Sequence, residues 1–415
     1  MTNKNNYNII NLLIGRIGTN VADSLFYMAI LWYFKTHFNS PMLLSVIFIA
    51  ESSIDMFSFT LGPIIDRIDI KKALKLVTIT QTMLSVIIIP LFNNQKLHFL
   101  GITFLIVVYV LSTIGSTLIY PAEDKILPNI YPAEDKILPN IVEKKELPKV
   151  NGIFQMSYQT LDLFLNAGAT ILITFLSIKN TIIISALVFA FALLFYTRLH
   201  FKLPAASLPE GNTSYFKDLV SGWQALRTNK NILILILPFA LTNLFYGISS
   251  VGLPYFATKY LNNSALSYGS LELASSIGGL LGSLIVQRLY VKDSQLRLLI
   301  VTCLMLSGLA IVLEVISAPI WPILILIFAL CSTFWISIMN INFKVLVQES
   351  FSSNLLGRII TINSSIVNCM IPIGSFLGGF IVKNYGARPA IILEGLAQLV
   401  TAVFYLIIFL KRKRA

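Results

Sequence analysis

Charged residues are scarce in this chain. Asp, Glu, Lys and Arg together make up 12% of its 415 residues, about half of their share in an ordinary soluble domain, which is about 25%. Hydrophobic residues are correspondingly frequent, at 56%. They occur in runs of about 20, the length that crosses a bilayer core of roughly 30 Å. This composition excludes a soluble globular protein and predicts an all-α integral membrane protein.

Cysteine and histidine are also rare, with three residues of each. The cysteines all lie inside apolar runs, where a cysteine acts as a small buried hydrophobic side chain, so no disulfide framework is implied. The histidines stand far apart at the ends of apolar runs, which argues against a metal site. Because the chain also lacks a glycine-rich loop ending in Gly-Lys-Ser or Gly-Lys-Thr, we expect no ATP-driven step and no cofactor. No nucleophile, base and orienting group can be assembled either, so we expect no enzyme.

Polar clusters divide the chain into twelve candidate transmembrane spans. They are residues 9–34, 41–65, 73–92, 99–120, 150–178, 181–199, 231–258, 267–289, 298–317, 320–343, 359–382 and 390–410. An even number of spans places both termini on one side of the membrane. Of the 31 lysines and arginines, 24 fall on that side, 6 fall on the other, and Arg16 lies within the first span. Since cytoplasmic loops are enriched in basic residues, we predict cytoplasmic termini and a location in the cell membrane. This asymmetry explains the net charge of +12 without nucleic-acid binding.

A long polar segment in the middle of the chain separates two sets of six spans. We therefore predict an N-terminal six-helix bundle at 1–199, a cytoplasmic linker at 200–230 and a C-terminal six-helix bundle at 231–415. Similar strings, Tyr-Phe-x-Thr at 33–36 and at 255–258, close the first span of each half. Chance among apolar residues would give the same match, but two pseudo-symmetric six-helix bundles are a known architecture of secondary transporters.

The loop between the second and third spans carries a motif. It consists of a glycine, an acid with an arginine, and a basic pair, namely Gly62, Asp66, Arg67, Lys71 and Lys72. This series resembles the loop signature of the major facilitator superfamily, although Asp69 and Ile70 stand where a glycine and a basic residue are commonest. The resemblance covers nearly the whole chain. It implies the major facilitator fold of twelve transmembrane helices.

Three other segments are similar to the branch of this superfamily that contains macrolide-efflux proteins and drug:proton antiporters. They are residues 143–152, then 348–358, with Gly357 and Arg358, and finally 371–374. We predict that the loop motif, together with Gly357 and Arg358, forms a conformational latch, because Asp66 can accept from the amides that begin the third span. The alternative for the basic residues of the loop is that they only anchor it at anionic lipid head groups.

Six carboxylates fall well inside the spans. They are Asp23, Glu51, Asp55, Asp162, Glu272 and Glu314. If all were ionised and faced lipid, they would cost about 15 to 21 kcal/mol, so they must face a cavity, form pairs or carry protons. We predict proton coupling by the first five, whereas Glu314 should be solvated at the outer interface. Structural ion pairs or hydrogen bonds between helices are the alternative for each acid.

Arg16 is the one basic residue well inside a span, and it needs an acidic partner or an anionic substrate. Aromatic side chains supply stacking surface for an amphipathic compound, although most aromatic residues of membrane proteins serve packing or the interface. We predict substrate contacts at Arg16, Tyr27, Phe57, Tyr158, Phe245, Tyr246 and Trp335. Small-residue pairs, Gly278 with Gly282 and Gly374 with Gly378, predict close helix contacts.

These features together predict a monomeric, proton-coupled exporter of a small organic molecule, such as a drug or macrolide-like compound, that works by alternating access. Export of an endogenous anionic metabolite, such as a carboxylate siderophore, is a second interpretation, in which Arg16 binds the substrate. An uptake permease and a non-transporting membrane receptor are alternatives of other classes.

Overall fold

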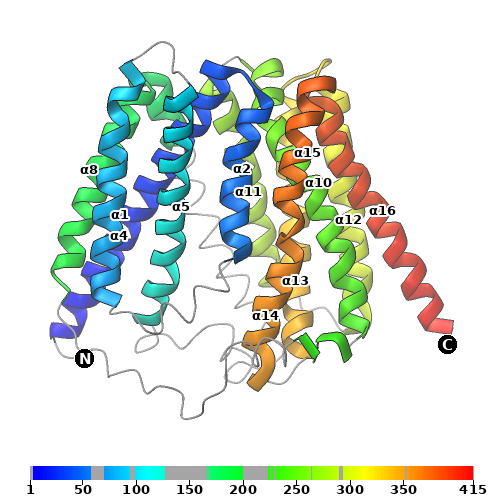
Figure 1. Cartoon of the computed structure of the whole chain (residues 1–415). Helices are drawn as coiled ribbons and strands as arrows, with labels where there is room; N and C mark the ends of the chain where they lie inside the picture. Colours follow the sequence, from blue (N-terminus) through cyan, green and yellow to red (C-terminus); the bar gives the residue numbers. More distant parts are fainter. Residues whose placement is uncertain are drawn as a thin grey trace.

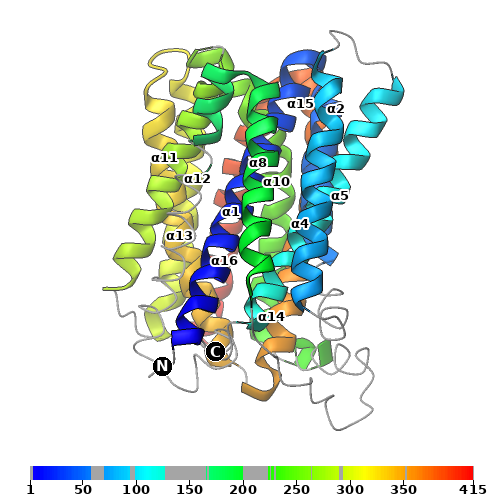
Figure 2. The same cartoon turned by 90° about the vertical axis from the view of Figure 1, so that its left-hand side faces the viewer.

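The computed structural model describes residues 3–57, 70–93, 99–126, 165, 168–199, 223–224, 226–228, 230–262, 264–288, 293–350 and 353–414. Regular structure throughout these residues is helical, without a strand among them. Long helices run side by side, and the two chain ends lie at the same end of the molecule (Figures 1 and 2). We call this end the terminal end and the opposite one the distal end.

The helices form an N-terminal and a C-terminal set. The N-terminal helices are α1 (Asn3–Tyr33) with its π-helical continuation η1 (Phe34–Phe38), α2 (Pro41–Phe57), α4 (Ile70–Ile88) with the 3₁₀ turn η3 (Ile89–Asn93), α5 (Phe99–Ile126) and α8 (Ile178–Thr197). The C-terminal helices are α10 (Lys230–Tyr260), α11 (Ala265–Val286), α12 (Asp293–Ser317), α13 (Leu324–Ser350), α14 (Ser353–Asn368), α15 (Met370–Tyr385) and α16 (Ala387–Arg414).

Each expected span except the fifth corresponds to a described helix, or to two successive ones. Most of the fifth span lies outside the described residues, but its part at 168–176 is helical. Nine helices of the described chain are long and apolar enough to cross a membrane. Helix α1 is not among the nine, because Arg16, Asn20 and Asp23 interrupt its apolar sequence, and α2 offers only a shorter apolar stretch at Pro41–Ser53.

The eleventh expected span is two helices, because the helix is interrupted at Cys369 between α14 and α15. Pro372 accounts for the interruption, since proline has no N–H for the carbonyl four residues earlier and its ring clashes with that carbonyl. Asn243 of α10 donates through Nδ2 to the Val367 carbonyl at 2.9 Å. A side chain of a neighbouring helix thus donates a hydrogen bond to the backbone near the point where the helical hydrogen bonds between α14 and α15 are interrupted.

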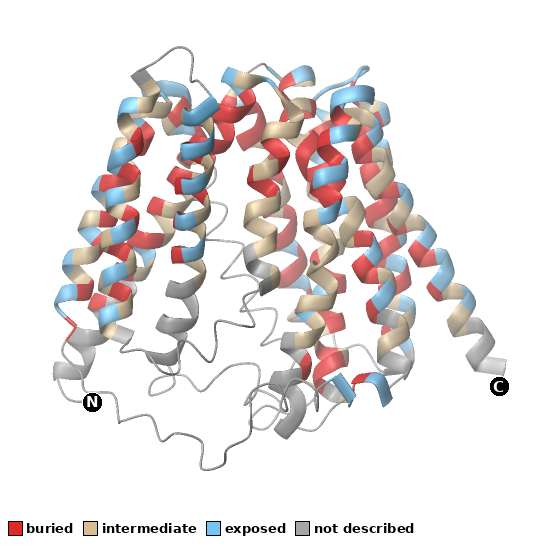
Figure 3. Cartoon of the chain, in the orientation of Figure 1, coloured by how far each residue is buried: buried red, intermediate tan, exposed pale blue. Residues whose placement is uncertain are grey.

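Buried apolar side chains form two clusters. The larger one lies toward the distal end and joins both helix sets, with Phe34 and Ile47 from the N-terminal set and Phe256 and Ile391 from the C-terminal set. The smaller one is formed by side chains of C-terminal helices, among them α12 and α13, and it includes Tyr405. Buried residues accordingly gather between the two sets near the distal end (Figure 3). The two sets are therefore held together mainly at that end.

Glycines provide the closest contacts between helices. Gly374 and Gly378 of α15 pack against the backbone of α10, where a Cβ on Gly378 would lie 2.6 Å from the Ile248 carbonyl oxygen. Gly278 and Gly282 of α11 pack against carbonyls of α13 in the same way. The close contacts expected for both glycine pairs are confirmed.

Replacing Gly378 by valine should lower the thermal unfolding temperature of the purified protein, because the new side chain meets a backbone carbonyl that moves only if two helices separate. Overpacking of this kind costs about 1 to 3 kcal/mol. Gly168→Val is the matched control, since nothing lies within 4 Å of a Cβ at that position. Equal losses at the two positions would contradict the close packing of α10 and α15.

Candidate functional site

A cavity of about 690 Å³ lies between the two helix sets. Helices α1, α2 and α5 line it on one side, and α10, α11 and α15 line it on the other. Its charged lining residues are Arg16, Asp23, Glu51 and Glu272. A volume of this size suits a drug-sized ligand. The fold thus gathers in one chamber acids that are far apart in the sequence.

The two helix sets touch directly on the distal side of the cavity. Helix α2 packs along α15, and a Cβ on Gly379 of α15 would lie 2.7 Å from Oγ of Ser45 in α2. A second contact joins Gly269 of α11 to Thr170, where a Cβ on the glycine would overlap the threonine side chain. Ser45 is 1% exposed and Thr170 is 2% exposed, so both contacts are buried between the helix sets.

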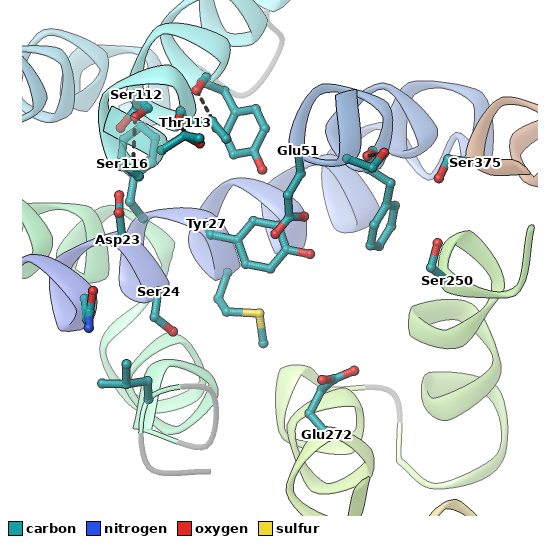
Figure 4. A pocket seen from close by; sticks show the side chains of 18 of the residues that line it. Asp23, Ser24, Tyr27, Glu51, Ser112, Thr113, Ser116, Ser250, Glu272 and Ser375 are labelled. Carbon is teal, nitrogen blue, oxygen red and sulfur yellow. Dashed lines mark hydrogen bonds between the residues drawn. The ribbon is translucent and has the colours of Figure 1, made fainter. Parts of the chain in front are cut away.

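Asp23 of α1 is held by a polar cluster from α4 and α5. Gln81 of α4 is completely buried and its Nε2 donates to Asp23 Oδ1 at 3.2 Å and to Ser116 Oγ at 2.9 Å. Ser116 also interacts with the Asp23 carboxyl group and donates to the Ser112 carbonyl at 3.1 Å. Figure 4 shows Asp23 beside Ser112 and Ser116 at one side of the cavity. The donors that this cluster offers to Asp23 are neutral.

Neutral donors compensate an ionised carboxylate only in part. A buried charge without a counter-ion is unfavourable by several kcal/mol, so proteins neutralise such a group by protonation or pair it with a cation. Within the described residues, the side chains that hydrogen-bond to the Asp23 carboxyl group are Gln81 and Ser116. The site can therefore hold a proton on Asp23 and release it when a cation or water enters the cavity.

Glu51 and Glu272 face the cavity from opposite helix sets. The Tyr27 ring of α1 lies beside Glu51 of α2, and it packs at 6.4 Å from the Tyr109 ring of α5. Across the cavity, Tyr268 and Glu272 of α11 are hydrogen-bonded to each other. Both carboxylates point toward the open centre in Figure 4. A bound molecule would therefore contact acids of both halves at once.

The cavity brings together six of the predicted site residues. They are Arg16, Asp23, Tyr27, Glu51, Tyr246 and Glu272. Phe245 and Trp335 do not line this cavity: Phe245 packs against the larger apolar cluster, and Trp335 packs edge-on against Phe334 at 4.9 Å between ring centroids. Phe245 and Tyr246 are adjacent on α10, so the rotation of this helix about its axis turns Tyr246 toward the cavity and Phe245 toward the apolar core.

Other predicted residues fall outside what the structure describes. Gly62, Asp66, Arg67, Tyr158 and Asp162 are not described, and Asp55, Phe57, Gly357 and Arg358 lie in described helices without described side chains. Lys71 and Lys72 stand at the start of α4. The latch and the second acid of α2 therefore stay predictions.

Sequence reasoning missed Gln81 and Ser116, the partners of Asp23, and Ser112, whose carbonyl accepts from both. All three interrupt an apolar run, and the two serines are four residues apart, so they share one face of α5. An amide in an apolar span is a usable signal, although a weaker one than a charge because its burial costs less. Among the described residues, no group of three or more His, Cys, Asp or Glu could hold a metal ion.

Comparisons with known proteins agree with this architecture. The sequence model of the Major Facilitator Superfamily matches residues 12–372 and again 253–415. The chain is 23% identical to an uncharacterized MFS-type transporter, YvqJ, of Bacillus subtilis (strain 168), over 96% of this chain and 91% of that protein. It is 21% identical to macrolide efflux protein A of Streptococcus pyogenes, over 92% and 91%. Among solved structures, the nucleoside transporter NupG matches with a TM-score of 0.69 and 13% identity, over 97% of this chain and 99% of that one.

The contact between Gln81 and Asp23 can be tested by a double-mutant cycle. Gln81→Leu should destabilise the protein because it leaves a buried carboxyl without its donor, whereas adding Asp23→Leu should recover part of the loss. A hydrogen bond contributes about 0.5 to 1.5 kcal/mol between neutral groups and about 1.5 to 3 kcal/mol to a charged group, and we expect a coupling in the free energy of unfolding within the first range when Asp23 is protonated and within the second when it is ionised. Gln295→Leu, at an exposed position of α12, is the matched control. Strictly additive losses would show that the two side chains are independent.

Proposed function

The chain belongs to the Major Facilitator Superfamily, and from this premise we propose that it exports a small organic molecule from the cytoplasm in exchange for protons. Family membership makes it a multi-pass membrane transporter of a small-molecule substrate rather than an enzyme. We further propose that it works as a monomer in the cell membrane, with cytoplasmic termini and without a cofactor. Its energy source is then the proton gradient.

The observation that carries this proposal is the charge of the cavity. Among the described residues, three carboxylates, Asp23, Glu51 and Glu272, line it together with a single basic residue, Arg16. Such a lining favours a cationic substrate, and a cation that binds there replaces protons as the neutralising charge. Competition of substrate and protons for the same acids is the physical basis of antiport. A macrolide with an amino sugar has suitable chemistry, and the efflux relative supports this class.

The proton gradient supplies enough free energy for this exchange. One proton that moves inward yields about 2.3 kcal/mol per 100 mV of membrane potential and about 1.36 kcal/mol per unit of pH difference. Together these terms support a concentration ratio above tenfold for each exported molecule, because tenfold requires about 1.4 kcal/mol.

Closure at the distal end supports alternating access. With cytoplasmic termini, the contacts of Gly379 with Ser45 and of Gly269 with Thr170 would seal the extracellular side. The predicted latch would act at the other end, where α4 begins with Lys71 and Lys72 and where α14 carries Gly357. Rocking of the helix sets would then break one set of contacts while it forms the other.

Two other functions have weaker support. Arg16 in the cavity suits an anionic metabolite such as a carboxylate siderophore, but three acids share the lining with it. The structural neighbour NupG is a nucleoside transporter, yet an identity of 13% shows the fold alone. An uptake permease would move substrate into the cell and a non-transporting receptor would move none, so the measured substrate flux distinguishes both from an exporter.

Vesicles with an inverted membrane test export and coupling together. An acidic lumen should drive accumulation of a radiolabelled macrolide, and an ionophore that collapses the gradient should abolish it. Asp23→Asn should reduce this accumulation to the level of empty vesicles while macrolide exchange across the membrane persists, because exchange needs no proton release. Asp293→Asn, at the start of α12, should behave like the unmodified chain. Accumulation that ignores the ionophore would refute the coupling.

The charge of the substrate can be tested at Arg16. Arg16→Ala should leave export of a cationic drug nearly unchanged, whereas it should abolish export if the physiological substrate is an anion. Arg297→Ala is the matched control, since Arg297 lies over the Phe409 ring at 5.6 Å, away from the cavity lining. Drug susceptibility of cells that express each variant measures the effect. Loss of cationic drug export in Arg16→Ala alone would contradict the proposed role of the acids.

A further inference from the structure

A second pair of acids lies outside the central cavity. Glu314 of α12 and Glu394 of α16 interact electrostatically with each other, and neither belongs to the cavity lining. The expectation that Glu314 is solvated at the outer interface is wrong, because its side chain is 3% exposed. Glu394 escaped notice in the sequence, since it lies only one turn inside the predicted twelfth span.

Close helix packing fixes the position of this pair. Helices α12 and α16 approach each other at Gly308 and Gly395, where a Cβ on Gly308 would lie 2.7 Å from the Gly395 carbonyl oxygen. Glu394 directly precedes Gly395, and Glu314 lies less than two turns beyond Gly308. Because the backbones are in contact there, packing fixes the backbone positions of the two glutamates relative to each other.

No basic side chain neutralises the pair within the described part of the chain. The nearby guanidinium of Arg388 donates to the Val315 carbonyl at 3.4 Å instead. The other basic residues of α10, α12, α13, α15 and α16 lie elsewhere. Lys259 and Lys383 are exposed, and Arg297 stacks on Phe409. Lys230 begins α10 at the terminal end, Lys344 is near the terminal end of α13, and residues 411–414 end α16. Two ionised carboxylates in this position would repel each other in a poorly solvated environment.

Two acceptor oxygens and one hydroxyl group around the pair have no hydrogen-bond partner of normal geometry. Gln398 donates through Nε2 to Glu394 Oε1 at 3.4 Å, while its own Oε1 has no partner. Ser249 of α10 is completely buried and faces Glu394, but its Oγ makes no hydrogen bond of normal geometry. Oε1 of Glu314 likewise has no partner. A proton on either carboxyl removes one charge and adds the missing donor.

We propose that Glu314 and Glu394 form a second proton-binding site, in which at least one of the two carboxyl groups is protonated at neutral pH. The site is separated from the cavity by one helix, α10, whose Ser250 lines the cavity while the adjacent Ser249 faces Glu394. Tyr246 lies between the two regions, because it lines the cavity and is near both Glu272 and Glu394.

Infrared difference spectroscopy on the purified full chain tests this site without any substrate. A step from neutral to alkaline pH should remove a carbonyl-stretch band of protonated carboxyl groups, and the double variant Glu314→Gln/Glu394→Gln should lack part of this band. The number of protons released in weakly buffered solution should fall by about one in the double variant. Ser307→Ala, which alters another buried side chain of α12, should leave both quantities unchanged.

The other outcomes of these measurements also decide for or against the proton site. If the double variant does not fold, Gln398→Leu keeps both acids and should shift the band, because Glu394 loses its donor. A band and a proton count that are identical in the unmodified chain and the variants would overturn the proposal. Loss of the band on replacing potassium by sodium ions at constant pH would also overturn it, in favour of a sodium site. Because Asp23 is unchanged in all these variants, failure here leaves the proposed antiport standing.

Discussion

The cost of burying carboxylates in a bilayer-spanning helical bundle governs this structure. An acid that faces lipid or packed protein must be neutralised by a proton, a cation or a substrate. Among the described residues, the cavity between the helix sets contains three such acids and one basic residue, and the polar cluster of Gln81, Ser112 and Ser116 supports Asp23 with neutral donors. In the exchange proposed above, protons and a cationic substrate would compete for these acids.

Contacts between the two helix sets concentrate at the distal end of the molecule. The two helix sets share a buried apolar cluster and glycine contacts at the distal end. Such contacts have two discrete arrangements, packed or separated, rather than a continuum, because packed interfaces do not deform gradually. In the proposed alternating-access cycle, the acids of the cavity would open to one side of the membrane at a time, so that protons and substrate would be released on the side opposite to the one where they bind.

Much of the fold could be predicted from the sequence, because the length and apolarity of a transmembrane helix are local requirements. Asp23, Glu51 and Glu272 were predictable cavity residues for the same reason, since an acid in an apolar run has few tolerable positions. Gln81 was missed because a buried amide is a weak signal. Glu394 was missed because hydropathy places the start of the twelfth span, near residue 390, only to within a few residues. Phe245 and Trp335 show the remaining limit, as helix rotation depends on neighbours that a single span does not reveal.

Proton release on substrate binding tests the central claim most directly. A macrolide added to the purified transporter in weakly buffered solution should displace about one proton per bound molecule at neutral pH. The same addition to the Asp23→Asn variant should displace none, while calorimetry still detects binding. Binding without any pH change in the unmodified protein would show that the buried acids are neutralised by permanent partners, and exchange of substrate for protons at these acids would be excluded.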